Sequence, residues 1–168
     1  GVLGLNYPEE YGGTGTAFTL FHSLVQTEEL SRPGAGGISA SLMTHGIGLP
    51  PVLAAGSEEL KRRIAPAVLA GEKIIALGIT EPGGGSDVAN LRTKATRKGA
   101  AYIVNGAKAL ITAGMRADYI PLAVRTGTAT YGAPFGAHEL STHRNTDADL
   151  AHFEAPAVGF LDLSEHRA

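Results

Sequence analysis

Residues 76–87 read ALGITEPGGGSD, in which an apolar stretch runs into three consecutive glycines, a hydroxyl and a carboxylate. We expect the apolar stretch, which begins at Lys73, to be a buried strand that continues through Ile79. Glycines allow a backbone to approach a ligand closely and to direct its N–H groups at an anion. Thr80 and Ser86 add hydroxyls that donate hydrogen bonds. The stretch therefore suggests a ligand-binding loop, although a glycine run by itself is more often a flexible turn.

Two common nucleotide-binding loops do not fit this stretch. A Walker loop needs Gly-Lys followed by Ser or Thr at the start of a helix, and no lysine follows these glycines. A Rossmann loop needs a following helix and an acidic residue further along, whereas strands are expected here.

A second motif, residues 105–114, reads NGAKALITAG. Asn105-Gly106 is the strongest short hairpin signal because both residues tolerate positive φ in a type I′ turn. It predicts strands over 102–104 and 107–112. In isolation this is an ordinary hairpin, and its place after the glycine loop is what points to a ligand site.

The residues before the glycine loop have the pattern of helices. Apolar residues at helical spacing predict helices over 16–31 and 36–48, with Ile38 and Leu42 on the inner face of the second. Pro50-Pro51 is expected to begin a new segment. Ser57 is a plausible N-cap for a short helix. Pro66 is expected to open another turn, and Gly71 to end it.

Strands are expected after this helical part, in the order that defines an α+β fold. Besides Lys73–Ile79, the strand pattern covers Asn90–Arg97 and Tyr119–Arg125, with Leu91, Thr93 and Ala95 alternating. We therefore expect a helical part over 1–72 and a mostly antiparallel β part over 73–127. The remaining residues, 128–168, have no clear period and form an irregular tail.

Composition narrows the class of protein. The 168 residues are 43% hydrophobic and 18% charged, as in a soluble globular domain. A net charge of -2 predicts no general attraction to nucleic acid or anionic membranes. The absence of cysteine excludes disulfides and thiolate chemistry. No apolar run is expected to span a bilayer, and a first residue of Gly1 suggests a fragment or a processed product.

Five stretches together resemble the acyl-CoA dehydrogenases over Gly1–Gly127: LGLNYPEEYGG, TEELSR, ALGITEPGGGSD, YIVNGAKALITAG and ADYIPLAVRTG. The succession of TEPGGGSD and NGAKALIT is the specific part of the resemblance. It implies an N-terminal helical domain, a middle β domain and a C-terminal four-helix domain, with FAD held between the β domain and the last helices.

The resemblance also implies roles for single positions. The residues that should face the flavin ring are Leu77, Ile79 and Thr80, with the Thr80 hydroxyl on the pyrimidine side. The residues that should approach the FAD pyrophosphate or the acyl-CoA are Gly85 and Ser86. The family's Trp-Ile-Thr beside the reactive face is matched by Leu110, Ile111 and Thr112, with Thr112 near the flavin N5 atom. Donors near N5 stabilise the charge that builds on the reduced ring.

Some positions depart from the family pattern. Leu110 replaces the usual tryptophan, and Ala113 stands where asparagine is common. The family's general base is a C-terminal glutamate, and no position of this chain matches it. Glu81 belongs to the loop motif and is expected to be structural. We therefore expect no catalytic residue and no metal ligand in this chain.

The resemblance implies a parent enzyme that dehydrogenates acyl-CoA thioesters with FAD and passes electrons to an electron-transfer flavoprotein. An acyl-CoA oxidase or a nitroalkane oxidase is an alternative for the parent. The parent is expected to be a homo-oligomer of the cytoplasm, or of the mitochondrial matrix in a eukaryote. The chain itself is expected to bind flavin or acyl-CoA without turnover, or to be a non-functional product.

The tail suggests a separate hypothesis: residues 128–168 are translated in the wrong reading frame. Back-translating 142–159 and moving the frame by one base permits residue types that the family places there. A divergent or fused tail is the alternative. Under the frame-shift hypothesis the tail is poorly ordered, and its histidines are not metal ligands because they lack ligand spacing. These are His138, His143, His152 and His166.

Overall fold

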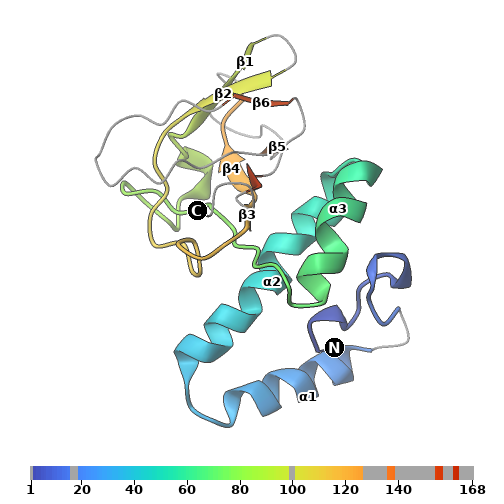
Figure 1. Cartoon of the computed structure of the whole chain (residues 1–168). Helices are drawn as coiled ribbons and strands as arrows, with labels where there is room; N and C mark the ends of the chain where they lie inside the picture. The colour runs from blue at the N-terminus through green and yellow to red at the C-terminus, as the bar shows by residue number, and fades with distance from the viewer. Residues whose placement is uncertain are drawn as a thin grey trace.

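Helices come first along the chain and short strands follow, which confirms the α+β class (Figure 1). The computed structural model describes residues 2–15, 19–98 and 101–126, and the backbone of three short strands in the tail. The helical elements are η1 (Val2–Gly4), η2 (Glu9–Tyr11), α1 (Leu20–Ser31), α2 (Gly36–Ala55), α3 (Glu58–Leu69) and η3 (Val88–Asn90). The strands are β1 (Lys94–Lys98), β2 (Ala101–Asn105), β3 (Tyr119–Ile120), β4 (Leu122–Val124), β5 (Gly136–His138), β6 (Glu154–Pro156) and β7 (Leu161–Asp162).

Helix α3 begins where its cap residue predicts. The Ser57 side chain accepts a hydrogen bond from the N–H of Leu60 at 3.2 Å. The helix ends just before Gly71, which has a φ of +79°. Pro66, however, lies inside the helix and does not open a new turn. The helix continues past this proline because Ile64 and Val68, both fully buried, pack into the core on either side of it.

Helix α2 is longer than predicted and runs through Pro50-Pro51 to Ala55. Leu49 and Val52, both at 0% exposure, hold this second half of the helix in the core. The expectation that no apolar run could span a bilayer was wrong for α2 by length and composition, since an 18-residue stretch within its 20 residues has a mean hydropathy of 1.2. Core helices of soluble proteins pass the same test of length and composition, so this one helix is weak evidence for a membrane.

Helix α1 and the first half of α2 leave their apolar residues exposed. Helix α1 begins after the Thr19 cap and has no buried residue. The predicted start of this helix, residues 16–18, lies outside the described part. Ile38 and Leu42 of α2 were expected on an inner face but are 64% and 38% exposed. The described residues supply no partner that covers these side chains, which is why helical spacing misplaced them.

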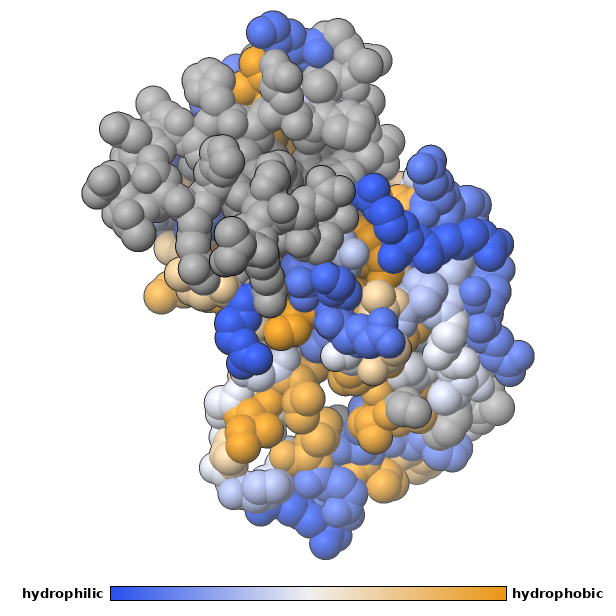
Figure 2. All heavy atoms as spheres, in the orientation of Figure 1, coloured by the Kyte–Doolittle hydropathy of each residue, from blue (hydrophilic) through white to orange (hydrophobic). Residues whose placement is uncertain are grey.

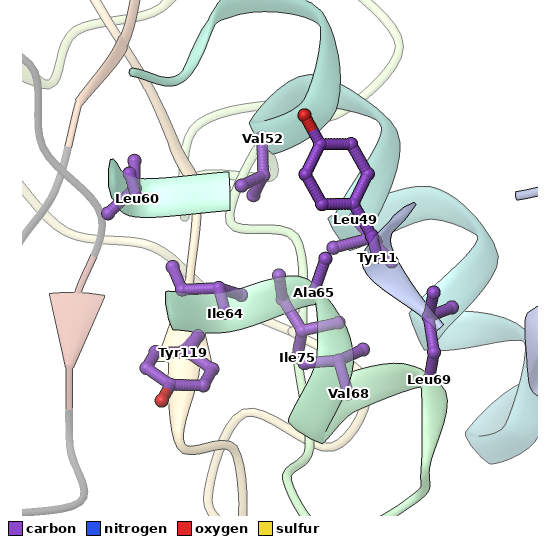
Figure 3. Close-up of a cluster of buried hydrophobic side chains, with 10 residues drawn as sticks. All are labelled: Tyr11, Leu49, Val52, Leu60, Ile64, Ala65, Val68, Leu69, Ile75 and Tyr119. Carbon is purple, nitrogen blue, oxygen red and sulfur yellow. The ribbon is translucent and has the colours of Figure 1, made fainter. Parts of the chain in front are cut away.

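The helical and β parts share one apolar core (Figure 3). Side chains of α2 and α3 meet Tyr11 of η2, and Ile75 and Tyr119 from the β part complete the cluster. Segment 74–78 runs from this core into the β part where a buried strand was predicted over Lys73–Ile79, but it forms isolated bridges at Ile75 and Gly78 and no continuous strand. It pairs in parallel with 119–123, with N–H to oxygen distances of 2.9 Å from Ala76 to Tyr119 and from Gly78 to Pro121.

The hairpin of the β part does not turn at Asn105-Gly106 as predicted. Strands β1 and β2 pair antiparallel with Lys94 opposite Asn105, so their connection lies at the other end, between Lys98 and Ala101. Gly106 has a φ of +152°, and a Cβ there would lie 2.6 Å from the Thr93 Cα. Glycine is therefore needed for close approach of two backbones. Residues 107–112 do not form the predicted strand.

The predicted alternation before and within β1 is confirmed. Leu91, Thr93 and Ala95 are 9%, 2% and 1% exposed, while the residues between them face solvent. In the tail, strands β5, β6 and β7 pair antiparallel with β4, β2 and β3 respectively. The expected disorder of the rest of the tail and the side chains of its four histidines lie outside the described residues.

Candidate functional site

The glycine loop is a tight turn closed by its own backbone. Glu81 and Gly84 exchange two hydrogen bonds, at 3.0 Å and 3.1 Å, around Pro82-Gly83. Gly85 then returns against Thr80, since a Cβ on Gly85 would lie 3.4 Å from the Thr80 Cγ2. The loop therefore brings Gly85 and Ser86 back beside the end of the buried segment 74–80.

Glu81 anchors this loop and is only 8% exposed. One carboxylate oxygen accepts the Arg92 N–H at 2.7 Å. The other accepts the N–H of Thr93 at 2.9 Å, the Thr93 hydroxyl at 2.5 Å and the Lys108 ammonium at 2.9 Å. These bonds tie the loop to the start of β1, so Glu81 has the structural role expected of it.

The charge of Glu81 is stabilised by the same contacts. Burial acts to raise the pKa of Glu81, but the bonds from the Thr93 hydroxyl, the Arg92 and Thr93 N–H groups and Lys108 together lower it to about 2. A carboxylate with so low a pKa and so many donors is a poor proton acceptor at neutral pH. Glu81 is therefore unsuited to act as a general base.

Lys108 joins the second motif to the first. Its side chain is 8% exposed, and its ammonium donates to the Ile79 carbonyl at 2.9 Å as well as to Glu81. The N–H of Ala109 donates to the Thr80 carbonyl, also at 2.9 Å. The two sequence motifs therefore lie side by side. Convergence of the Thr80 and Thr112 hydroxyls on one ligand stays a prediction.

The eight predicted ligand positions lie on this junction and differ in exposure. The partly buried positions are Leu77, Ile79, Thr80 and Ile111, and the exposed positions are Gly85, Ser86, Leu110 and Thr112. Leu110 is 92% exposed and has a left-handed backbone conformation, with a φ of +57°. Ile111 packs against the small apolar cluster of the β part.

Three hydroxyls at the junction remain available to a ligand. Within the described part of the chain, the side chains of Thr80, Ser86 and Thr112 make no hydrogen bond. A half-buried hydroxyl such as that of Thr80 normally finds a partner, and an apolar side chain as exposed as Leu110 favours an apolar cover. A planar group with an apolar face and polar edges fits this set of side chains, and the isoalloxazine ring of FAD is such a group.

Sequence reasoning missed Arg92, Thr93 and Lys108 as parts of the site. A signal existed for Thr93, because an alternating strand predicted a polar residue facing inward, and such a residue requires a buried partner. Lys108 lies within a quoted motif, but spacing along the chain does not show that a lysine reaches back to Glu81. Only the fold brings these groups together.

A hollow of about 600 Å³ lies elsewhere, between η1, α1 and α2, and is lined by both hydrophobic and polar residues (Figure 2). His45 borders it, with a buried Nδ1 atom that has no partner among the described residues. Among residues 2–15, 19–98 and 101–126, no group of three His, Asp or Glu side chains is placed to hold a metal ion. The junction of the two motifs is thus the candidate site, because it combines unpaired hydroxyls with an exposed apolar side chain.

Comparison with protein families gives two matches along the chain. The family model described as "Acyl-CoA dehydrogenase, N-terminal domain" matches residues 1–72, and "Acyl-CoA dehydrogenase, middle domain" matches residues 76–146. The second match runs past Gly127, so the resemblance extends further into the tail than the quoted motifs do.

Individual relatives agree with these matches. An acyl-CoA dehydrogenase of Mycobacterium tuberculosis is 40% identical over 133 residues, covering 79% of this chain and 32% of the relative. Mitochondrial isovaleryl-CoA dehydrogenase of Pongo abelii is 39% identical over 81% of this chain and 32% of its own length. The crystal structure of a probable acyl-CoA dehydrogenase from Mycobacterium abscessus superposes with a TM-score of 0.75 at 39% identity, covering 95% of this chain and 47% of that one. This chain thus spans less than half the length of each of these proteins.

Proposed function

Because this chain belongs to the acyl-CoA dehydrogenase family, we propose that its two motifs form one wall of an FAD site. The observation that carries the proposal is the junction of Thr80, Lys108 and Ala109, which joins the loop of Thr80 to the segment that carries exposed Leu110. Members of the family are FAD-dependent flavoproteins.

Each side chain of the junction has a distinct task in this proposal. The Thr80 hydroxyl would donate to the pyrimidine side of the flavin ring, and Thr112 would donate near N5. Leu77, Ile79, Leu110 and Ile111 provide apolar contact to the ring. Gly85 and Ser86 approach the pyrophosphate or the acyl-CoA. When FAD is bound it supplies a hydride acceptor, and fixed donors beside it stabilise the charge that develops.

The reaction of the whole protein is proposed to be α,β-dehydrogenation of an acyl-CoA thioester. In that reaction a base would take the α proton, bound FAD would supply the acceptor for the β hydride, and an electron-transfer flavoprotein would receive the electrons. An acyl-CoA oxidase is the alternative, distinguished by direct reactivity with oxygen. We propose that this homo-oligomeric parent acts in the cytoplasm, or in the mitochondrial matrix in a eukaryote.

For the 168-residue chain itself we propose flavin binding without turnover. Glu81 is the buried carboxylate at the junction, and its hydrogen bonds and low pKa leave it unable to act as the base. No sequence position matches the family's catalytic glutamate. A chain that holds part of the contacts binds more weakly than a complete site, because the entropy cost of association is still paid in full.

Titration of the purified chain with FAD tests this proposal. Bound flavin is measured by fluorescence quenching and by co-elution in gel filtration. Loss of one hydrogen bond worth about 1 kcal/mol weakens binding about fivefold. We therefore expect Thr80→Val and Thr112→Val each to raise the Kd for FAD by that factor. Absence of FAD binding at any attainable concentration would refute a flavin-binding role for this chain.

Thr96→Val is the matched control because Thr96 is an exposed threonine on β1, away from the junction. Its Kd should equal that of the unaltered chain. Acyl-CoA added to the flavin-loaded chain should leave the flavin absorbance unchanged. Bleaching of the flavin would show turnover and would contradict the absence of a base.

A further inference from the structure

Lys108 binds the residues on both sides of Thr80. Its ammonium donates to the carbonyl of Ile79 and to the carboxylate of Glu81, each at 2.9 Å, and these are the residues immediately before and after Thr80. The adjacent Ala109 N–H holds the Thr80 carbonyl itself at 2.9 Å. Three successive residues of one motif are thereby fixed to two successive residues of the other.

The ion pair is buried, so its geometry is restricted. Both side chains are 8% exposed. Burial lowers the pKa of Lys108, while the hydrogen bond and charge of Glu81 oppose that change. A buried ion pair is weak evidence for added stability, because desolvation offsets much of the attraction. In some proteins such a pair instead selects one arrangement of the groups it joins.

The two partners are not equally dependent on each other. Glu81 keeps three other donors if Lys108 is removed, from the Arg92 N–H and from the N–H and hydroxyl of Thr93. Removing the Glu81 carboxylate instead deprives two backbone N–H groups and the Thr93 hydroxyl of their acceptor at once, and leaves the Lys108 ammonium only the Ile79 carbonyl. A change at Lys108 therefore loosens the junction while it leaves the anchor of the glycine loop in place.

We propose that Lys108 is a positioning residue that sets Thr80 relative to the segment leading to Thr112. This inference rests on the proposed function, since those two hydroxyls are the proposed flavin donors. Lys108 does not itself contact the ligand. It fixes the spacing between two donors that must meet one rigid ring, and small errors in such spacing are costly.

Lys108→Met is the informative variant, because methionine keeps a long apolar side chain of similar length but removes the donor. The Kd for FAD should rise about tenfold. The effect of Thr112→Val on the Kd should also shrink from about fivefold to less than twofold in the Lys108→Met background, since the Thr112 donor is then no longer held in register. A purely structural lysine would leave the Thr112→Val effect unchanged.

Lys73→Met is the matched control. Lys73 pairs with Asp118 at 3.4 Å and also joins two segments of the β part, away from Thr80. It tests the same substitution and the loss of an ion pair. We expect it to leave both the Kd for FAD and the size of the Thr112→Val effect unaltered.

A second measurement needs no flavin. In the ligand-free chain, amide hydrogen exchange at Ala109 should be about tenfold faster in Lys108→Met. Exchange at Ala76, whose N–H donates to the Tyr119 carbonyl, should be unchanged. Failure of the unaltered chain to bind FAD refutes the proposed function, whereas exchange at Ala109 still decides the role of Lys108. Equal Ala109 exchange in the two proteins, or acceleration of Ala76 to the same degree, overturns the positioning role.

Discussion

Helices α1 and α3 each have 12 residues and each carries an apolar face, but only α3 buries it. Ile64 and Val68 of α3 are fully buried among side chains of α2, η2 and the β part. Phe21 and Leu24 of α1 are 76% and 55% exposed. In Figure 1, α1 lies farthest from the strands, while α3 lies beside the crossing from helices to strands. Helical pattern alone therefore does not determine whether a face belongs to the core.

The junction of the two motifs differs from both helices because polar groups complete its core. The apolar cluster there consists mostly of small or medium residues, with Ala76, Ala95 and Ala117 among them. Glu81, Thr93 and Lys108 supply the remaining contacts through hydrogen bonds. The stability of this region should therefore depend on pH, whereas that of the α3 core should depend on packing volume.

The largest expected effect separates α3 from α1. Ile64→Ala removes a side chain with 0% exposure and should lower the free energy of unfolding by about 2–5 kcal/mol. Leu24→Ala changes a side chain that is 55% exposed, and should alter it by less than about 0.5 kcal/mol. Urea unfolding followed by circular dichroism measures both. Similar losses for the two variants would contradict the difference in burial.

The next effect is a loss of folding stability at acidic pH. The pKa of Glu81 falls from its ordinary 4.5 to about 2 on folding. A carboxyl whose pKa is lower in the folded state stabilises the fold above its unfolded pKa, and that stability is lost as the pH falls through the folded value. We expect a loss of about 3 kcal/mol between about pH 4.5 and about pH 2.

NMR titration of the glutamate side-chain carboxyl carbons measures this pKa directly, and urea unfolding across the same pH range measures the stability. Glu81→Gln should show a smaller acid dependence because the titrating group is gone. An ordinary pKa for Glu81 would contradict the network that surrounds it.

The sequence predicted the parts of the fold that depend on neighbours along the chain. The Ser57 cap, the end of α3 before Gly71 and the alternation of Leu91, Thr93 and Ala95 were all found as expected. These features depend on local hydrogen bonds or on the period of one element. They need no knowledge of distant contacts.

Predictions failed where distant contacts decide. Pro50-Pro51 and Pro66 remain within helices because buried neighbours hold the helices together. Gly106 serves an approach to Thr93 that no local pattern reveals. Likewise, the family motifs pointed to Thr80 and Thr112, but the reach of Lys108 to Glu81 emerged only from the fold. The frame-shift hypothesis for the tail stays a prediction that sequencing of the coding DNA decides.

A smaller effect compares the two helix caps. Ser57→Ala removes the acceptor for the Leu60 N–H at the start of α3 and should lower the free energy of global unfolding by about 1 kcal/mol. Thr19→Ala disrupts the capping box with His22 in α1, and should fray that helix with little effect on global unfolding. The two are distinguished by comparing urea unfolding with amide exchange in each helix. An equal global loss would show that α1 is coupled to the core after all.

The smallest effect on stability is expected at Phe21, yet this change should alter association. Phe21→Glu places a charge on a side chain that is 76% exposed, so the free energy of unfolding should change by less than about 0.5 kcal/mol. The exposed apolar face of α1 favours association of chains, and the charge should reduce it in sedimentation velocity at high protein concentration. Ser41→Glu adds the same charge at an exposed polar residue of α2 and should leave association nearly unchanged. If both variants reduced association equally, net charge would be responsible, and the exposed face of α1 would have no special part in it.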